Sequence, residues 1–280
     1  MGQGANRAWL GTLRAVHSFG DNVEIACADG QTRQTLEFMG EVTSIDMRWP
    51  ALTWANRKLN YRFMAGEAAW ILSGSEKLED IAPFNSHIAK FSDDGVRFEG
   101  AYGPKIVSQM DYVVDALVKE PTSRRAVLTI WRENPPPSRD TPCTISVQFL
   151  LRDGYLNELV YMRSSDTWLG LPYDLFTFTM VAATVYLKLR DKGLDLRGLG
   201  RLTNIAGSRH LYQQDVEKIR AKNFLDDPGA TNTVTKYPHF DPDAYVNAEA
   251  LLDHLWAVAR CERQNLRSKF ISDLTIKETA

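Results

Sequence analysis

The sequence predicts a single domain of mixed α and β structure. Segments with apolar residues at helical spacing alternate with shorter segments rich in β-branched and apolar residues. Of the 280 residues, 44% are hydrophobic and 24% are charged, which is ordinary for a globular chain. No internal repeat, low-complexity tract or clear linker divides the chain, so we expect one domain over residues 1–280.

The first half of the chain predicts three helices and three short strands. Apolar residues at helical spacing predict a helix over residues 8–17, and alternating residues then predict strands over 23–28, 35–39 and 42–47. A helix over residues 57–72 ends at Ser73-Gly74. The next helix, over residues 104–117, begins with Pro104 and carries its apolar residues on one side.

The second half contains the most apolar segments. Buried strands are predicted over residues 125–131 and 144–151, and the turn Asp153-Gly154 leads into a third over 155–162. The remaining predictions are an apolar helix over 175–189, a strand over 203–206, a helix over 215–222, a loop over 226–243 and an amphipathic helix over 248–260.

Charge, hydropathy and cysteine content exclude several classes of protein. The net charge of -2 gives no global positive field for nucleic acid or an anionic membrane. The longest apolar run, around residues 180–187, is far below the ~18 residues of a membrane span, and residues 1–6 lack the apolar stretch of a signal peptide. Three widely spaced cysteines fit a reducing cytosol rather than a disulfide framework. With no CxxC or HExxH and scattered histidines, we expect no metal site.

Cys143 is the candidate nucleophile. It follows Pro142 at the start of a predicted strand, and several arginines lie nearby in the sequence. A cysteine attacks as the thiolate, and cationic neighbours favour that form. The alternative is a buried, inert cysteine.

Two arginine motifs are candidate phosphate ligands. Ser123-Arg124-Arg125 and Arg163-Ser164 each place guanidinium groups beside a hydroxyl, next to otherwise apolar strands. That chemistry suits a phosphate, and solvated surface arginine is the alternative.

Three further side chains could act on a ligand. Glu67 lies inside an apolar helical segment, where it could be a general acid or base of raised pKa, or a paired structural carboxylate. His210 and Tyr212 end a predicted strand and could donate to a sugar hydroxyl, or form a half-buried pair. The residues alone thus indicate a cysteine nucleophile with an anion site.

Several of these segments, taken in order, resemble the thymidylate synthase family. Pro142-Cys143 before a strand, YMRSSDTWLGLPYDLF (residues 161–176) and GSRHLY (residues 207–212) are similar to its central signatures. Upstream, EAAWILSG around Glu67 resembles the helix of the catalytic glutamate, and GAYG (residues 100–103) resembles a conserved turn. The resemblance runs from about residue 33 to about residue 220.

The resemblance implies a fold, a cofactor and an activity. The fold would be α+β, a large mixed β-sheet covered by helices, with two sheets packed back-to-back in a homodimer. The cofactor would be 5,10-methylenetetrahydrofolate and the substrate a pyrimidine nucleoside monophosphate. Cys143 would attack carbon 6 of the pyrimidine, Glu67 would manage protons through water, Tyr102 would lie near the reacting carbon, and Asp166 would contact the folate.

The resemblance also implies the substrate-binding residues. Arg163 and Ser164 would hold the phosphate, helped by the partner subunit's Arg124 and Arg125, so the two active sites would be shared. His210 and Tyr212 would hold the sugar hydroxyl. No metal, nucleic acid or membrane would be involved, and the location would be the cytoplasm, that of the host if a phage encodes the chain.

Departures from the synthase pattern indicate a particular branch. Thr144, Met162 and Ser208 stand where the synthase has His, Gln and Asp. These segments instead resemble the phage deoxycytidylate hydroxymethylases, which predicts conversion of dCMP to 5-hydroxymethyl-dCMP. The alternatives are CMP hydroxymethylation, dCMP methylation, thymidylate synthase or dUMP hydroxymethylase activity, and a non-catalytic nucleotide- or RNA-binding relative.

Asp174 and residues 82–95 carry the finer prediction. Asp174 stands where the synthase has Asn, and a protonated Asp can donate to nitrogen 3 of cytosine while accepting from the amino group. The alternative is that Asp174 caps the following helix. Residues 82–95 contain no tryptophan, whereas the synthase has a tryptophan-rich segment there, so we expect water rather than hydride to complete the reaction.

Overall fold

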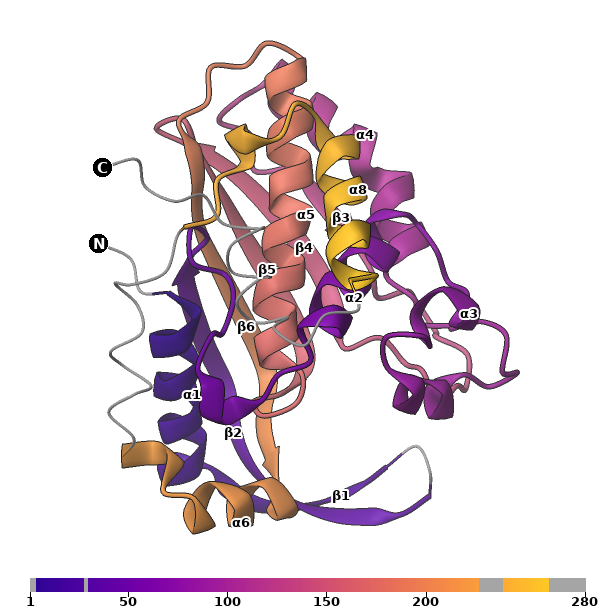
Figure 1. The fold of residues 1–280 in the computed structure, drawn as a ribbon, viewed down its shortest axis with the longest axis vertical. Helices are drawn as coiled ribbons and strands as arrows, with labels where there is room; N and C mark the ends of the chain where they lie inside the picture. The colour runs from indigo at the N-terminus through magenta and orange to yellow at the C-terminus, as the bar shows by residue number, and fades with distance from the viewer. Residues whose placement is uncertain (1–3, 28–29, 227–238, 262–280) are drawn as a thin grey trace.

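The computed structural model describes residues 4–27, 30–226 and 239–261 and confirms the α+β fold class (Figure 1). One six-stranded sheet has the order β1-β2-β6-β5-β4-β3. β5 and β6 pair in parallel, and the other neighbours are antiparallel, so the sheet is mixed as expected. The strands are β1 (Asp21–Ala26), β2 (Thr32–Asp46), β3 (Val127–Thr129), β4 (Thr144–Arg152), β5 (Tyr155–Asp166) and β6 (Gly198–Tyr212).

Seven α-helices are defined in the described residues. They are α1 (Ala5–Phe19), α2 (Tyr61–Leu72), α3 (Leu78–Ile81), α4 (Gly103–Lys119), α5 (Leu171–Asp191), α6 (Gln213–Ala221) and α8 (Ala248–Ala259). Short 3₁₀ turns lie at Ala55–Arg57, Ser86–Phe91, Phe224–Asp226 and Pro242–Ala244. Although α5 is long and largely buried, no helix in the described part of the chain is long and apolar enough to cross a membrane.

Several predicted elements differ in extent from the observed ones. The strands predicted over 35–39 and 42–47 are one strand, β2, that passes through Gly40 at a φ of 70° without losing register with β6. The strand predicted over 203–206 is the fifteen-residue β6, because pairing with both β2 and β5 extends it through polar sequence. The strand predicted over 125–131 is only Val127–Thr129.

The helix predicted over 57–72 begins four residues later, at Tyr61. Lys58 has a φ of 50°, which interrupts the helical path, and the Asn60 side chain then caps the helix by accepting from the Phe63 amide at 3.0 Å. The helix predicted over 175–189 starts earlier, at Leu171, because Pro172 fits the first turn. Most of the loop predicted over 226–243 lies outside the described residues.

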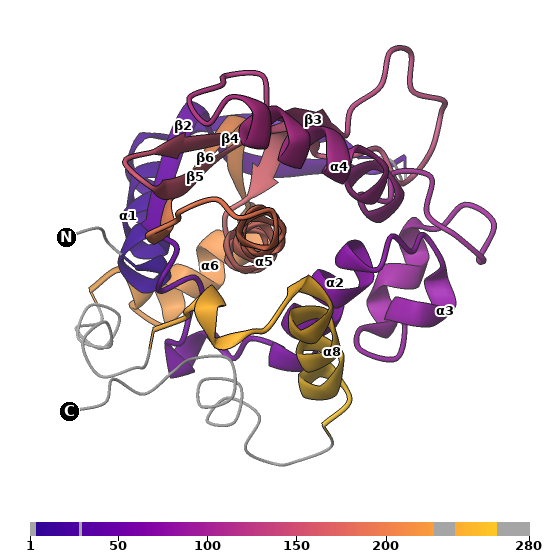
Figure 2. The same ribbon diagram turned by 90° about the horizontal axis from the view of Figure 1, so that it is seen from above.

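The arrangement of layers brings one edge of the sheet close to two helices. α5 lies between the sheet and the pair α2 and α8 (Figures 1 and 2). Because β5 and β6 are parallel, their carboxyl ends meet at one edge, where Asp166 is the cross-strand partner of His210. β4 begins at this edge too, since Thr144 pairs with Met162. The segments with the candidate site residues therefore converge there.

Candidate active site

Cys143 lies immediately before β4 with an arginine fixed beside it. The Arg163 amide donates to the Cys143 carbonyl at 2.8 Å, and its guanidinium Nη2 lies 3.8 Å from the Cys143 Sγ. The same guanidinium donates to the carbonyls of Pro142 and Thr141 at 2.9 and 3.0 Å. These bonds hold a positive charge at the sulfur.

The groups around the Cys143 thiol have opposite effects on its pKa. Burial raises the pKa of Cys143, the Arg163 charge lowers it, and the carboxylates of Asp174, Asp140 and Asp166 raise it. Arg163 is thus the group that favours the thiolate. Protonation of the nearby carboxyls would remove part of the repulsion that opposes it.

Tyr102 is positioned against the loop that carries Cys143. Its hydroxyl accepts from the Thr144 amide at 3.2 Å, and its ring stacks on Phe178. Burial and the nearby Cys143 raise the pKa of Tyr102. The turn before it is tied to the same loop, because the Gly100 amide donates to Asp140 Oδ2 at 2.7 Å.

Two carboxyls, one on each of two helices, carry raised pKa values. Burial, followed by the charge of Asp174, raises the pKa of Glu67 to about 8, against a weak 3.5 Å hydrogen bond from Thr177. Burial also raises the pKa of Asp174 to about 6; the Arg209 charge opposes this rise, Asp166 adds to it, and a hydrogen bond from Ser165 opposes it. Groups that change protonation near neutral pH can serve as acid or base.

Asp166 ends β5 with one oxygen engaged and one available. Oδ1 accepts from the Trp168 and Leu169 amides at 2.7 and 2.8 Å. Burial raises its pKa, while these amides and His210 lower it. Oδ2 accepts no hydrogen bond from the described residues, and the neighbouring Leu169 side chain is 51% exposed.

The expected phosphate and sugar ligands lie at the same edge. Arg163 is exposed, and Ser164 is half-buried opposite Ser208 of β6. His210 is 8% exposed and packs edge-to-face on Tyr212, with ring centroids 5.3 Å apart. The structure therefore brings these residues together at the carboxyl ends of β5 and β6.

Arg124 and Arg125 do not join this site within one chain. Both are exposed, and Arg125 forms an ion pair with Glu120 at 2.6 Å. The Arg124 carbonyl accepts from Gln148, which is five residues along β4 from Cys143, or roughly 16 Å at ~3.3 Å per residue. Within one chain, Arg124 and Arg125 therefore lie away from Cys143.

One component of the site was missed in the sequence. Arg209 is fully buried, and its guanidinium donates to Glu41 at 2.9 Å, Ser165 at 2.5 Å and Asn204 at 2.7 Å. Little in the sequence signals Arg209, because it stands between Ser208 and His210 in a polar part of β6. Its partner Glu41 lies far away in sequence, so only the pairing of β2 with β6 reveals the contact.

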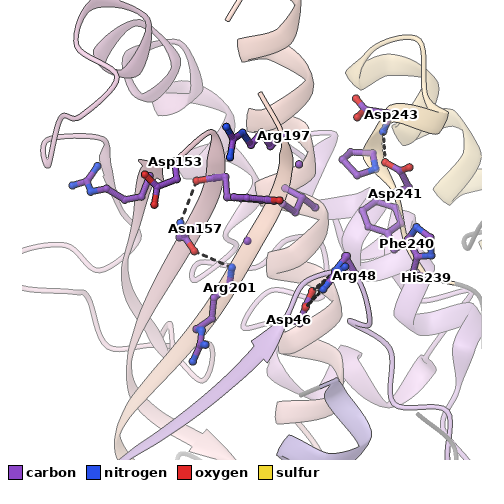
Figure 3. A pocket seen from close by; sticks show the side chains of 16 residues that line it. Asp46, Arg48, Asp153, Asn157, Arg197, Arg201, His239, Phe240, Asp241 and Asp243 are labelled. Carbon is purple, nitrogen blue, oxygen red and sulfur yellow. Dashed lines mark hydrogen bonds and ion pairs between the residues drawn. The ribbon is translucent and has the colours of Figure 1, made fainter. Parts of the chain in front are cut away.

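A separate cavity lies away from this site. It measures about 570 Å³ and is lined by the opposite ends of β2, β5 and β6, including Arg48, Tyr155 and Arg201 (Figure 3). Tyr155 is eight residues from Arg163 along β5, or roughly 26 Å. Some of the polar groups that line this cavity have partners, since Arg48 pairs with Asp46 and the Asn157 side chain accepts from the Arg201 amide. None of the candidate site residues from the sequence lines this cavity.

A thiol held beside an arginine, with two carboxyls of raised pKa, is typical of enzymes that act through a cysteine nucleophile. The chain belongs to the thymidylate synthase family, which it matches over residues 9–228. Members of this family use methylenetetrahydrofolate in one-carbon transfer to pyrimidine nucleotides.

Three relatives illustrate the similarity. The chain is 29% identical over 224 residues to the deoxyuridylate hydroxymethyltransferase of Pseudomonas phage M6, covering 75% of this chain and 62% of that protein. It is 27% identical over 200 residues to the deoxyuridylate hydroxymethyltransferase of Bacillus phage SP01, covering 61% and 50%. It is 27% identical over 202 residues to the thymidylate synthase of Pseudomonas fluorescens (strain SBW25), covering 62% and 69%. The chain thus spans only 50% to 62% of the length of the two phage relatives.

Proposed function

We propose that this protein is a folate-dependent hydroxymethyltransferase that acts on carbon 5 of a cytosine nucleotide, converting dCMP to 5-hydroxymethyl-dCMP through a covalent Cys143 adduct. The observation that carries the choice of base is Asp174, a carboxyl near Cys143 whose pKa is raised to about 6. Family membership supports the one-carbon chemistry, and the names of the two phage relatives support the hydroxymethyl product.

The chain's own residues provide the covalent chemistry. The Cys143 sulfur adds to carbon 6 of the pyrimidine, which makes carbon 5 nucleophilic. Arg163 stabilises the thiolate, and Glu67, with its pKa raised to about 8, holds a proton that it can exchange through water. Tyr102 lies beside the cysteine loop, where its hydroxyl can assist proton movement at the ring.

The residues beyond Asp166 fit a folate. When bound, 5,10-methylenetetrahydrofolate supplies the one-carbon unit. Asp166 Oδ2 offers an acceptor for the N–H groups along the edge of a pterin, and the exposed Leu169 offers an apolar surface for its flat face. The absence of tryptophan over residues 82–95 supports addition of water rather than hydride after transfer.

Asp174 matches the hydrogen-bonding pattern of cytosine. A protonated carboxyl donates to nitrogen 3 and accepts from the amino group, whereas uracil presents the reverse pattern. Each unsatisfied buried group costs about 1–3 kcal/mol, or roughly 10- to 100-fold in affinity. Donation to the ring would also stabilise the charge that develops when Cys143 adds, so Asp174 should affect rate as well as binding.

A second candidate substrate is dUMP. The two phage relatives are named deoxyuridylate hydroxymethyltransferases, which favours uracil. A ribose substrate also fits, because His210 and Tyr212 would serve a hydroxyl that dCMP and CMP share. The test is to incubate the purified protein with methylenetetrahydrofolate and each of dCMP, CMP and dUMP, and to measure product masses.

We expect the wild-type protein to give a hydroxymethylated cytosine nucleotide, and Asp174→Asn to shift the preference toward dUMP by at least about 10-fold. Thr184→Ser is the matched control, since Thr184 lies further along α5 and its hydroxyl donates to the Met180 carbonyl of the same helix. Faster turnover of dUMP than of dCMP and CMP by the wild type would reject the cytosine assignment. Formation of dihydrofolate in step with product would reject water addition.

Replacement of the nucleophile separates an enzyme from a non-catalytic binding relative. Cys143→Ala should abolish product formation while nucleotide binding, measured by calorimetry, changes by less than about 10-fold, because phosphate contacts supply most of the affinity. Persistence of the cellular function in a Cys143→Ala strain would indicate a binding role instead.

A further inference from the structure

A buried ion pair lies behind the base site. Arg209 of β6 and Glu41 of β2 are both buried, and Arg209 Nε donates to Glu41 Oε2 at 2.9 Å. Glu41 also accepts from Thr12 at 3.0 Å and from Thr43 at 2.9 Å. An isolated buried charge is costly, so each partner depends on the other to remain ionised.

The guanidinium reaches toward the base site on its other side. Arg209 Nη1 donates to the Ser165 hydroxyl at 2.5 Å, and both the Arg209 charge and the Ser165 hydroxyl lower the pKa of Asp174. Glu41, Arg209 and Ser165 thus form a continuous series of hydrogen bonds next to Asp174. Among the described residues, Arg209 forms an ion pair with Glu41 and does not form one with Asp174.

Several other charged or titratable groups face Asp174. They are Asp166 of β5, Glu67 of α2, Cys143 before β4 and Tyr102 before α4. All of these are neutral or negative, and Arg209 is the cation that acts on Asp174. The Arg209 charge favours the ionised form of Asp174. The strength of this effect therefore depends on how fully Glu41 neutralises the Arg209 charge.

We propose that Glu41 is a positioning residue for base recognition: by holding Arg209 in a buried ion pair, it leaves the carboxyl of Asp174 without a cationic partner and so able to carry a proton to the base. This inference rests on the proposed cytosine specificity and extends it to a residue on another strand. The same protein without the Glu41 charge would present an Asp174 carboxylate, which cannot donate to nitrogen 3.

The two members of the ion pair should have opposite effects. In Glu41→Gln, the uncompensated Arg209 charge stabilises the Asp174 carboxylate, so the midpoint of Asp174 titration falls by about one pH unit or more. In Arg209→Gln, the Glu41 charge opposes ionisation of Asp174, so the midpoint rises. In the double variant both charges are gone, and the midpoint returns toward the wild-type value.

The test is an infrared titration of the free protein. The band of a protonated carboxyl that disappears in Asp174→Asn is assigned to Asp174, and its midpoint is followed in the single and double variants. Glu41→Asp, which keeps the charge, and Glu79→Gln, which removes an exposed charge on α3, should both stay near the wild-type midpoint. If one single variant does not fold, the other still gives a shift of defined sign, and the double variant should lie closer to the wild-type midpoint than that single variant does.

The pH profile of kcat/KM gives a second readout. With dCMP, the loss of activity on raising the pH should begin at lower pH in Glu41→Gln than in wild type. Midpoints that do not move, or that move in the same direction in both single variants, would overturn the inference even if dCMP is the substrate. Opposite shifts in a protein that prefers dUMP would instead uphold the coupling and reject the cytosine assignment.

Discussion

Glu158 of β5 is a buried carboxyl that lies away from the reaction site. Its side chain is fully buried on the core face, with Phe149 and Leu202 as cross-strand neighbours. Neither of its oxygens has a hydrogen-bond partner among the residues that the structure describes. Burial raises its pKa well above the ordinary value near 4.5, so the folded protein favours the protonated acid.

Removal of this carboxyl should stabilise the protein in a pH-dependent way. Because the folded-state pKa is raised, the stability associated with the neutral acid is complete below pH ~4.5 and falls by about 1.4 kcal/mol per pH unit until the folded pKa is reached. Glu158→Leu should therefore raise the free energy of unfolding by an amount that grows from pH 5.5 to 7.5.

Urea denaturation at three pH values between 5.5 and 7.5 would measure this effect. The matched control is Glu79→Leu, whose side chain is 74% exposed and should give a small difference that does not vary with pH. A gain in Glu158→Leu that is constant across pH would show that the ionised carboxylate is stabilised in the folded protein.

Individual elements show which parts of the structure local sequence determines. Helices α1, α4 and α8 follow the predicted ranges within a few residues, because one continuous apolar stripe specifies each of them. β6 was predicted over only four residues, since its polar end is held by pairing with β2 and β5 rather than by its own pattern. The site shows the same division.

Cys143, Glu67 and Arg163 could be nominated from the sequence because their residue types suggest chemistry. The roles that we assigned to these residues came from the resemblance to the thymidylate synthase family, which depended on the order of the motifs along the chain. The contacts of Arg209 with Glu41, and of Gly100 with Asp140, could not be predicted, since they join segments far apart in the chain. Long-range polar contacts leave no periodic signal in either segment.

Gly100 allows two loops of the site to approach closely. A Cβ at this position would lie only 2.2 Å from the Asp140 carbonyl oxygen, so a side chain would force the turn before Tyr102 away from the loop before Cys143. Gly100→Ala should lower kcat by about 10-fold or more, because displacement of reacting groups by an ångström is enough to do so.

Steady-state kinetics and thermal denaturation would test this prediction together. Gly11→Ala is the control, since a Cβ on this exposed position of α1 meets nothing within 4 Å and should leave kcat unchanged. Normal kcat in a stably folded Gly100→Ala protein would mean that the two loops can separate without cost to the reaction.

At the scale of the whole molecule, the two faces of the sheet differ. On the core side, Thr43 bonds to Thr12 of α1, and α5 packs on β5 and β6 (Figure 2). Because side chains alternate along a strand, Val42, Ile205 and Tyr161 point to the opposite face, where they form a row of cross-strand partners. Val42 is 54% exposed, and the other two are half-buried.

This partly apolar face supports our proposal that two sheets pack back-to-back in a homodimer. Val42→Asp should weaken such an interface, because it would bury an unpaired charge. Sedimentation should then show a dimer for wild type and a shift toward monomer for the variant. A monomeric wild-type protein with full activity would exclude both the dimer and shared sites.

Shared active sites can be tested by complementation between subunits. One chain carries Cys143→Ala, and the other carries Arg124→Ala with Arg125→Ala, so each homodimer is expected to be inactive. In a heterodimer, the arginine-substituted chain keeps its own Cys143 and receives intact arginines from its partner, which restores one of two sites. Random mixing should therefore recover about a quarter of wild-type activity.

The control mixes a Cys143→Ala chain with a Glu67→Gln chain. One chain brings Cys143 and Glu67 to the same site, so this mixture should recover no activity. Equal recovery in both mixtures, or none in verified heterodimers of the first, would contradict sharing of the phosphate site across the dimer.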